Sequence, residues 1–431
     1  MNRFVPAGGS PPAREARAKV AASLSLLLIL SPLLAMAEET RDAPPPEQAD
    51  EKVRLEEELA RELGTASPPP DAPIVPAAPG PKLLPDISLI GTFAAAAFSD
   101  EPTLRFPAHE PLHDGPQLQE IELVFQSNID PYLRADVFLA ISSEGLEVEE
   151  AYASTLALPW NLQLRAGQFF APVGRFNQMH FLEVSPFVDL PLPNRRFFGG
   201  EQLRGVGAEA SAILPLPFYF ELRAAALTPD NDVSFGVPGE AVRHAEDLLG
   251  VLRALSSFDL ADRLTLNLGA SFATGPNASG APEIDDLHRT DVWGADLYLR
   301  LRDRSSRAYT ALQSEFLYRR ATAPGGTVEQ SGVYAWLVRR FDEHWEAAVR
   351  GDILPSGRTI GTPALGEEIG PFLEPASQWR VGAAVSWYPT EFQRLRVQFN
   401  HDAGLGDDAD PVQEWFLQYQ FTMGAHGAHP F

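Results

Sequence analysis

The C-terminal part of the chain alternates between bulky apolar and polar residues. Every second residue from Trp415 to Met423 is apolar, and most positions between them are polar. A period of two is the side-chain repeat of a β-strand, so the pattern predicts a strand over 412–424 with one apolar and one polar face. Such a strand packs either against a second sheet or against lipid.

The same alternation recurs from Asp86 onward and predicts sixteen strands. They span 86–98, 117–129, 132–142, 146–158, 162–170, 203–214, 218–228, 246–258, 263–274, 290–302, 307–320, 328–341, 344–354, 377–388, 392–402 and 412–424. Short connections such as 130–131 and 389–391 alternate with mostly longer ones, so tight turns gather at one end of the strands. An all-β transmembrane antiparallel β-barrel has this layout, with turns in the periplasm and loops outside. A soluble β-sandwich has no reason to sort its loops this way.

Charged residues fall on one face of each predicted strand. Glu120 and Glu122 alternate with Ile121 and Leu123, for example. A sixteen-strand cylinder is too wide for side chains to fill, so this charged face is predicted to line water. Six aromatic residues near strand ends are candidates for the membrane boundary, where amphipathic rings are favoured. They are Trp336, Trp345, Trp379, Trp387, Tyr388 and Trp415.

The first 37 residues have the pattern of a cleaved signal peptide. A basic leader precedes an apolar stretch from Val20 to Leu34, and Ala35-Met36-Ala37 supplies small residues before a cleavage site after Ala37. A membrane anchor is the weaker alternative, because Ser31-Pro32 interrupts a stretch already shorter than the ~20 residues of a spanning helix. The mature protein is therefore expected to leave the cytoplasm.

Residues 38–85 predict a periplasmic arm rather than a globular domain. Residues 48–63 are rich in helix formers and could form a short helix or weak coiled coil, or else remain a solvated charged stretch. Eight prolines in 66–85 predict an extended linker. The barrel then occupies 86–431.

Charge and composition narrow the classes of partner. The formal net charge is −24, which excludes nucleic acid as a natural partner, and there are no cysteines to form disulfides or thiolate metal sites. All three lysines precede residue 86. From Asp86 onward the charged residues are 25 arginines and 46 acidic residues.

The segment 147–200 carries a set of recognisable motifs. They are EVEEAY at 147–152, LRAGQF at 164–169, APVGR at 171–175, PFVDLP at 186–191 and FGG at 198–200. This block resembles phosphate-selective porins of the O and P type. The resemblance implies a sixteen-strand outer-membrane pore and allows a homotrimer. The absence of lysine from the barrel departs from the phosphate-selective pattern.

The C-terminal region resembles a related group often labelled zinc-regulated TonB-dependent outer-membrane receptors. The similarity lies in Pro389-Thr-Glu391, Arg394-Leu-Arg396 and the ending GAHGAHPF. A receptor of that kind needs a globular plug in a larger barrel, usually of about twenty-two strands. The short arm before residue 86 cannot form such a plug. A porin-like channel for passive diffusion of small hydrophilic, including anionic, solutes is therefore the favoured function, with a receptor or a structural barrel as alternatives.

The longest connection, from Ala171 to Gln202, is rich in phenylalanine and carries Arg175, Arg195 and Arg196. A loop this apolar is costly to leave in water, so it is predicted to fold into the lumen with its arginines facing the passage. The alternative is a loop folded over the barrel mouth or against a neighbouring subunit.

Eleven charged residues are candidates for the pore lining or its constriction. They are Arg165, Arg175, Arg195, Arg196, Arg300, Arg350, Arg380, Arg396, Asp296, Glu315 and Asp352. The arginines could form an anion track, because guanidinium binds oxyanions bidentately. Equally, the carboxylates could pair with them and stiffen the wall.

The remaining patterns give weaker signals. His426-x-x-His429 and His109-x-x-x-His113 could bind zinc only with further ligands, so surface histidines are the favoured interpretation and no metal or cofactor is predicted. Asn400-His401-Asp402 is the sole candidate catalytic cluster, but neighbours in a strand point to opposite faces, so no enzyme activity is expected.

The end of the chain resembles an assembly signal. Tyr419, Phe421 and the terminal Phe431 are its candidate residues, to be recognised by the barrel assembly machinery. Loop carboxylates such as Asp407 and Asp408 could bridge to lipopolysaccharide through divalent ions. The predicted partners are therefore outer-membrane lipid, lipopolysaccharide and the assembly machinery.

Overall fold

The computed structural model describes residues 85–424, except 102–108, 232, 237–241, 243, 280–287, 305–306, 365–369, 374–375 and 407–408. The predicted signal peptide, residues 38–84 of the predicted arm, and Phe431 of the predicted assembly signal lie outside these residues.

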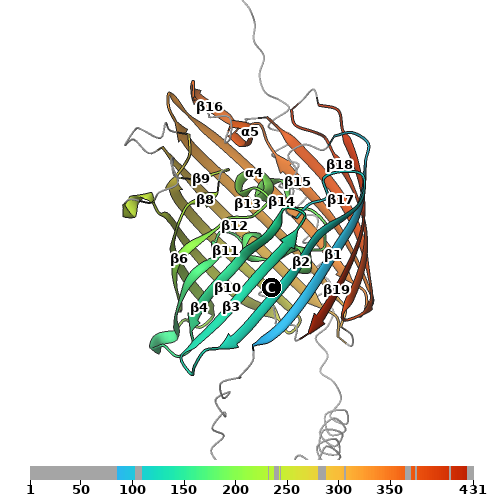
Figure 1. Cartoon of the computed structure of the whole chain (residues 1–431), viewed down its shortest axis with the longest axis horizontal. Helices are drawn as coiled ribbons and strands as arrows, with labels where there is room; N and C mark the ends of the chain where they lie inside the picture. Colours follow the sequence, from blue (N-terminus) through green and yellow to red (C-terminus); the bar gives the residue numbers. More distant parts are fainter. Residues whose placement is uncertain are drawn as a thin grey trace, which may run out of the picture. The chain divides into compact units, whose positions relative to one another are not determined.

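Sixteen antiparallel strands form a closed barrel (Figure 1). They are β1 (Asp86–Phe98), β2 (Gly115–Asn128), β3 (Leu133–Ser142), β4 (Gly145–Thr155), β5 (Leu162–Phe170), β6 (Arg204–Ile213), β7 (Tyr219–Leu227), β10 (Leu249–Ala261), β11 (Leu264–Pro276), β12 (Arg289–Arg302), β13 (Tyr309–Ala323), β14 (Gly326–Arg340), β15 (Trp345–Leu354), β17 (Gln378–Thr390), β18 (Gln393–Asp402) and β19 (Val412–Gly424). Each pairs with its neighbour in sequence, and β19 pairs with β1 to close the cylinder. The predicted sixteen-strand barrel is confirmed.

Short helices and strands occur in the connections between the barrel strands. A two-stranded hairpin joins β8 (Asp230–Asn231) to β9 (Phe235–Gly236), and β16 (Arg358–Gly361) pairs with β14 beyond the end of β15. The short helices are η1 (Pro159–Asn161), η2 (Phe176–Gln178), α3 (Phe181–Val184), α4 (Leu192–Phe198), η3 (Ala245–Asp247) and α5 (Gly370–Leu373). None of the helices among the described residues has the length and apolar character needed to cross a membrane.

Aspartates build the tight turns at one end of the barrel. Between β2 and β3, the side chain of Asp130 accepts hydrogen bonds from the N–H groups of Tyr132 (2.7 Å) and Leu133 (2.9 Å). Asp342 does the same between β14 and β15 for His344 (2.7 Å) and Trp345 (2.8 Å). An aspartate that bonds the backbone two and three residues on stabilises a short reversal, which explains why these connections need so few residues.

The outer wall is apolar and rich in exposed aromatic rings. Trp345 stacks on Trp387 with centroids 6.2 Å apart, and Trp415 packs against Phe399 at 4.4 Å. The three tryptophans are about half exposed, as expected of a lipid-facing surface. Trp336 is an exception to the prediction, because it is only 4% exposed and belongs to a cluster inside the barrel.

Candidate functional site

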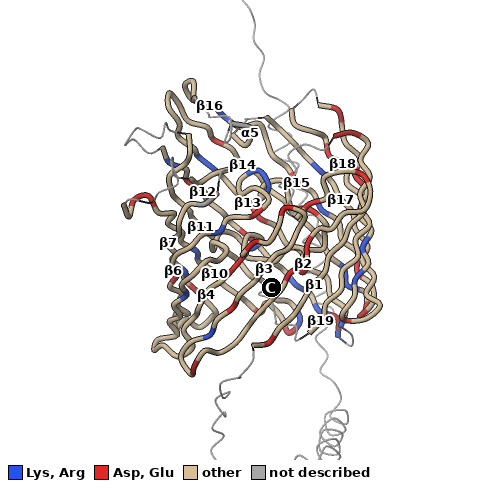
Figure 2. The backbone as a smooth tube through the Cα atoms, viewed as in Figure 1, with Lys and Arg blue, Asp and Glu red and all other residues tan. Residues whose placement is uncertain are grey.

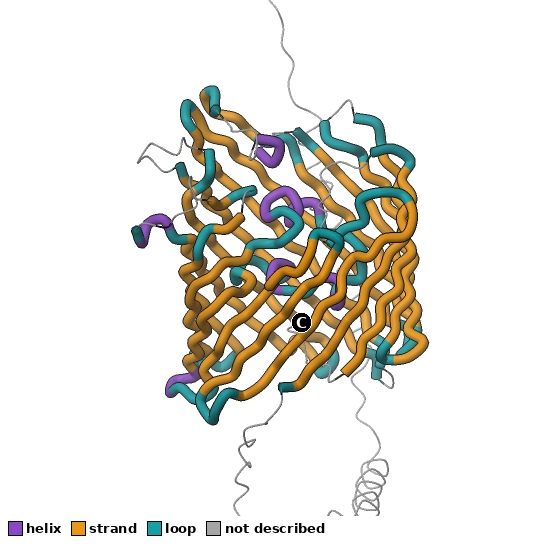
Figure 3. Tube along the Cα trace, in the orientation of Figure 1, coloured by secondary structure: helices purple, strands orange, loops and turns teal. Residues whose placement is uncertain are grey.

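The connection between β5 and β6, residues 171–203, lies inside the barrel; it is called the inner loop below. It contains η2, α3 and α4, and Figure 3 shows these helices within the ring of strands. Its phenylalanines Phe176, Phe187 and Phe197 are fully buried, and the first two pack with Trp336 of the wall. The prediction that this segment folds into the lumen agrees with the structure.

Asn177 fixes the base of the inner loop. Its amide nitrogen donates to the carbonyls of Ala171 (2.9 Å) and Leu203 (2.8 Å), and its oxygen accepts from the N–H of Leu203 (2.7 Å). One fully buried side chain therefore ties together the first and last residues of the loop.

Gly174 allows the loop to approach the wall at Glu315 of β13. The carboxylate of Glu315 accepts the backbone N–H groups of Arg175 (3.2 Å) and Phe176 (3.1 Å). Gly174 has φ of 60°, and a Cβ there would lie 1.9 Å from Glu315 Oε1. Both the left-handed backbone and the close carboxylate require glycine at this position.

A buried network of charges centred on Asp189 holds the middle of the loop. Asp189 pairs with Arg350 of β15 (2.8 Å) and Arg380 of β17 (2.6 Å), and Asp352 contacts the same two arginines at 3.1 and 2.9 Å. Asn400 of β18 donates to Asp189 at 3.1 Å. All four charged side chains are 0% exposed. Residues from one loop and three strands thus share a single desolvated network.

Two of the three loop arginines, Arg195 and Arg196, do not face an open passage, contrary to the prediction. Arg195 and Arg196 are each 2% exposed, and Arg195 pairs with Glu110 at 2.6 Å. Arg396 of β18 is 1% exposed and donates to Ser185 O at 2.6 Å and Gln418 at 3.1 Å. The predicted water-lined wall is covered at Arg396, because the loop lies against it and supplies the carbonyl of Ser185 as an acceptor.

Charged residues of both signs occur on many strands of the barrel (Figure 2), and the other predicted wall residues belong to several of them. Arg165 pairs with Glu209 of β6 at 3.0 Å, and Asp296 pairs with Arg253 of β10 at 2.7 Å. Arg300 is exposed and lies over the ring of Tyr309 at 4.4 Å. Paired charges, the alternative to a continuous anion track, thus account for many of these side chains; their role in a pathway stays a prediction.

Two cavities that contain charged side chains lie between the inner loop and the wall. One, of about 130 Å³, is lined by Arg175, which stacks over Tyr298 at 4.2 Å. The other, of about 240 Å³, is lined by Arg340, Arg394 and Glu183. Burial raises the pKa of Glu183 to about 8. Val184, Tyr309 and Glu346 line both cavities, so the two are adjacent.

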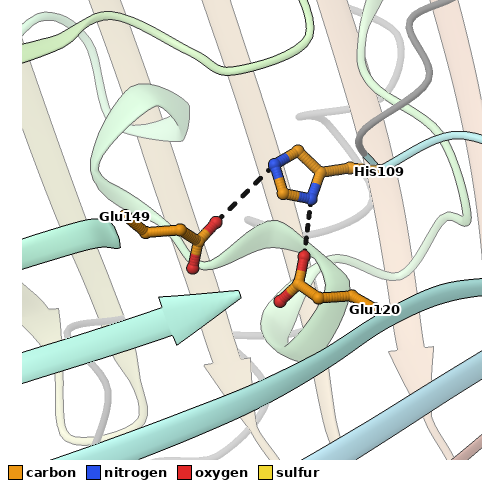
Figure 4. A group of neighbouring side chains, drawn as sticks. All are labelled: His109, Glu120 and Glu149. Atoms are coloured by element: carbon orange, nitrogen blue, oxygen red, sulfur yellow. Dashed lines mark hydrogen bonds and ion pairs between the residues drawn. The ribbon is translucent and has the colours of Figure 1, made fainter. Parts of the chain in front are cut away.

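His109 and His180 lie inside the barrel among glutamates. They are 5% and 6% exposed, so the interpretation of His109 as a surface histidine is wrong. Burial opposes protonation of both rings, but the neighbouring carboxylates outweigh it and raise the pKa of each histidine well above its usual value. Glu120 and Glu149 approach His109 (Figure 4).

Sequence reasoning missed Asp189, His180 and the paired acids Glu149 and Glu150. The consecutive acids were a usable signal, because regular alternation would send one of them into the apolar outer face. The partners of Asp189 on the barrel wall are about 160 to 210 residues away, so no local pattern could reveal them.

Comparison with known proteins places the chain in a family. No protein-family model matches the sequence. An uncharacterized protein of Aquifex aeolicus (strain VF5) is 31% identical over 390 residues, which covers 81% of this chain and 80% of that protein. This chain belongs to the same family as the Aquifex protein.

Solved structures share the fold at low sequence identity. OmpT of Vibrio cholerae in its trimer form has a TM-score of 0.51 and 6% identity, covering 80% of this chain and 100% of that chain. An anion-selective porin from Comamonas acidovorans has a TM-score of 0.50 and 10% identity, covering 79% of this chain and 100% of that chain. The likeness to outer-membrane porins is therefore one of fold, and the O and P subtype stays a prediction.

Proposed function

We propose that the protein is an outer-membrane channel for passive diffusion of small hydrophilic solutes, narrowed by its inner loop. The observation that carries the proposal is the pair of cavities between the inner loop and the wall, lined in part by charged side chains, inside a barrel whose outer surface is apolar. The wall residues of these cavities come from β12 to β15 and from β17 to β19. A polar interior within an apolar band is the arrangement of a transmembrane barrel with an aqueous path. The sixteen strands and a loop, rather than a globular plug, favour a porin over an energised receptor.

The residues along the cavities suit small anions. Arg175, Arg340 and Arg394 line them, together with the carboxylates of Glu183, Glu346 and Glu391. Because the pKa of Glu183 is about 8, that side chain is largely neutral at pH 7 and leaves the arginines in excess. In a confined passage of low dielectric these charges act strongly on permeating ions. We therefore propose a preference for anions at the constriction.

Planar-bilayer recording tests the channel and its selectivity. Wild-type protein is expected to give discrete conductance steps. In a gradient of concentrated salt, where the acidic outer surface is screened, its reversal potential should indicate selectivity for anions. Arg175→Ala should move the reversal potential toward cations. Arg196→Ala is the matched control, because Arg196 is buried and lines neither cavity, so its selectivity should stay that of the wild type.

A closed structural barrel is the second candidate, because Arg319, Arg380 and Gln398 in the lumen are fully buried. Absence of conductance from protein that is folded by circular dichroism would refute the channel and favour this alternative.

We further propose a homotrimer in the membrane. The outer face of β5, β6 and β7 carries a shallow apolar groove lined by small residues, including Ala166, Ala208, Ala224 and Ala226. Small side chains let barrel walls approach closely. Cross-linking of the wild type should yield trimers, whereas cross-linking of the Ala224→Trp variant should yield monomers. An unchanged yield of cross-linked trimer from the variant would place the interface elsewhere.

A further inference from the structure

The His and Glu side chains inside the barrel come from four separate segments. His109 precedes β2, His180 precedes α3 of the inner loop, Glu120 and Glu122 lie on β2, and Glu149 lies on β4. All five are 3–6% exposed. They form two groups of metal-type donors, with His109, Glu120 and Glu149 in one and Glu122, Glu149 and His180 in the other. Glu149 belongs to both groups.

Two β-bulges direct side chains into this cluster. In the β3–β4 ladder, Phe138 pairs with Glu150 and Leu139 with Val148, which leaves Glu149 as an extra residue. Both Glu149 and Glu150 consequently face the interior. Bulges often re-aim side chains at functional sites.

The second bulge is in β2 and positions the histidine. Thr92 pairs with Glu120 and Phe93 with Leu118, so Gln119 is the extra residue. Gln119 then donates from its amide to the carbonyl of His109 at 2.9 Å.

The distances around Glu149 match a pair of bridged ions. Its Oε1 lies 3.6 Å from His109 Nε2, and its Oε2 lies 3.4 Å from His180 Nδ1. A further carboxylate approaches each of these nitrogens, Glu201 at 3.3 Å for His109 and Glu122 at 3.5 Å for His180. Two donors on one tetrahedral zinc, each bonded at about 2.1 Å, are about 3.4 Å apart.

The other nitrogen of each ring also has a carboxylate partner. His109 Nδ1 lies 2.6 Å from Glu120, and His180 Nε2 lies 3.0 Å from Glu150. Metal-binding histidines commonly donate their second N–H to a carboxylate, which fixes the ring and makes it a stronger ligand. In each imidazole, therefore, one nitrogen is held by a carboxylate and the other faces an oxygen of Glu149.

The cluster also lacks positive charge. Glu120, Glu122, Glu149 and Glu150 have no arginine or lysine partner among the residues that the structure describes. Glu122 Oε1 is buried and makes no hydrogen bond within this part of the chain. Four buried carboxylates therefore share this site without an arginine or lysine partner among the described residues. Buried charge without compensation is strongly unfavourable, and divalent cations would supply the balance.

We propose that this cluster binds two divalent transition-metal ions, bridged by Glu149, with His109 on one ion and His180 and Glu122 on the other. Two imidazole nitrogens favour zinc-like ions over calcium or magnesium, which prefer oxygen ligands alone. Because His180 belongs to the inner loop and Glu122 and Glu149 to the wall, the ions would fasten the loop to β2 and β4.

Zinc counting on the whole protein tests the proposal. In the parent protein for this test, His426 and His429 are replaced by Asn to remove the C-terminal histidines. The parent protein is purified in detergent, stripped of metal with EDTA and loaded with zinc, and its zinc content is measured by elemental mass spectrometry. The expected content is two zinc ions per chain, with calcium unable to compete. H109N and H180N should each lose one ion, and E149Q should lose most of both. H113N is the matched control, because His113 is exposed, and should keep two.

A second readout separates metal binding from folding. X-ray absorption at the zinc edge of the parent protein should show nitrogen and oxygen ligands with imidazole scattering. Zinc should raise the thermal midpoint of the parent protein and not of folded E149Q. The proposal is overturned if the folded parent protein retains no zinc, if E149Q binds as much as H113N, or if a single ion depends equally on both histidines.

Discussion

Replacing Asp189 by asparagine tests whether buried charge holds the inner loop in the lumen. Asp189 is 0% exposed and bonds Arg350 and Arg380 at 2.8 and 2.6 Å. In D189N the two buried guanidinium groups share a single carboxylate, that of Asp352. The loop should then dock less tightly, because one buried positive charge loses its compensation.

The size of the effect follows from the environment of the network. Removing one partner of a buried ion pair costs about 3–5 kcal/mol. The asparagine oxygen still accepts one hydrogen bond and Asp352 remains, so the lower end, about 3 kcal/mol, applies. At about 1.4 kcal/mol per factor of ten, the equilibrium between docked and displaced loop should shift roughly 100-fold. The double variant D189N/R350Q removes the excess charge and should recover part of this loss.

Single-channel recording and thermal unfolding measure the two consequences. D189N should show larger or noisier conductance steps and a lower thermal midpoint than the wild type. E343Q is the control, because Glu343 and its partner Arg307 are 61% and 85% exposed at 3.9 Å, and such surface pairs contribute little. If D189N keeps both the conductance and the midpoint of the wild type, the buried charges do not hold the loop and apolar packing alone does.

Three further substitutions test other parts of the structure. G174A should weaken loop docking by about 2 kcal/mol or more, from left-handed backbone strain and the clash with Glu315, whereas G351A, with no atom within 4 Å of its Cβ, should leave the thermal midpoint unchanged. N177A removes three hydrogen bonds at the loop base and should lower the midpoint, by about 1–3 kcal/mol in free energy; an unchanged midpoint would contradict that role. The double variant Y419D/F421D places two charges on the outer wall and should reduce the amount of heat-modifiable barrel in membranes. The free-energy cost of each Asp should be below the ~2–4 kcal/mol of an Arg or Lys at the bilayer midplane. Normal insertion would argue against lipid contact at these positions.

The sequence predicted the barrel because its signal is local. Alternation is a property of neighbouring residues, and aspartate turns are encoded within three or four positions, so strand number followed directly. The interior face of β2 was identified correctly from Glu120 and Glu122. The prediction that these carboxylates line water was wrong, because they are 4% and 3% exposed. The assignment of faces was also correct for β19, where Tyr419 lies on the outer face and is 37% exposed.

The site was harder to predict because it depends on distant contacts and on breaks in the alternation. The charges of Arg350 and Arg380 were correctly placed inside, but their burial required knowing where Asp189 docks. The bulges at Gln119 and Glu149 each add one residue to a strand, and a rule of period two assigns such residues to the wrong face. Both failures coincide with the parts of the lumen that carry the network and the histidine cluster.

The packing of the inner loop also explains why arginine rather than lysine suits two buried positions of the lumen. Arg380 donates from Nε to Asp352, from one terminal nitrogen to Asp189 and from the other to the carbonyl of Leu190. Arg319 similarly reaches Ser234, Gln330 and the carbonyl of Phe372 while fully buried. A guanidinium presents five N–H donors in a planar fork, whereas a lysine ammonium is a point charge that cannot satisfy acceptors spread over three directions. At Arg319 and Arg380, arginine therefore suits a lumen filled by a docked loop better than lysine would.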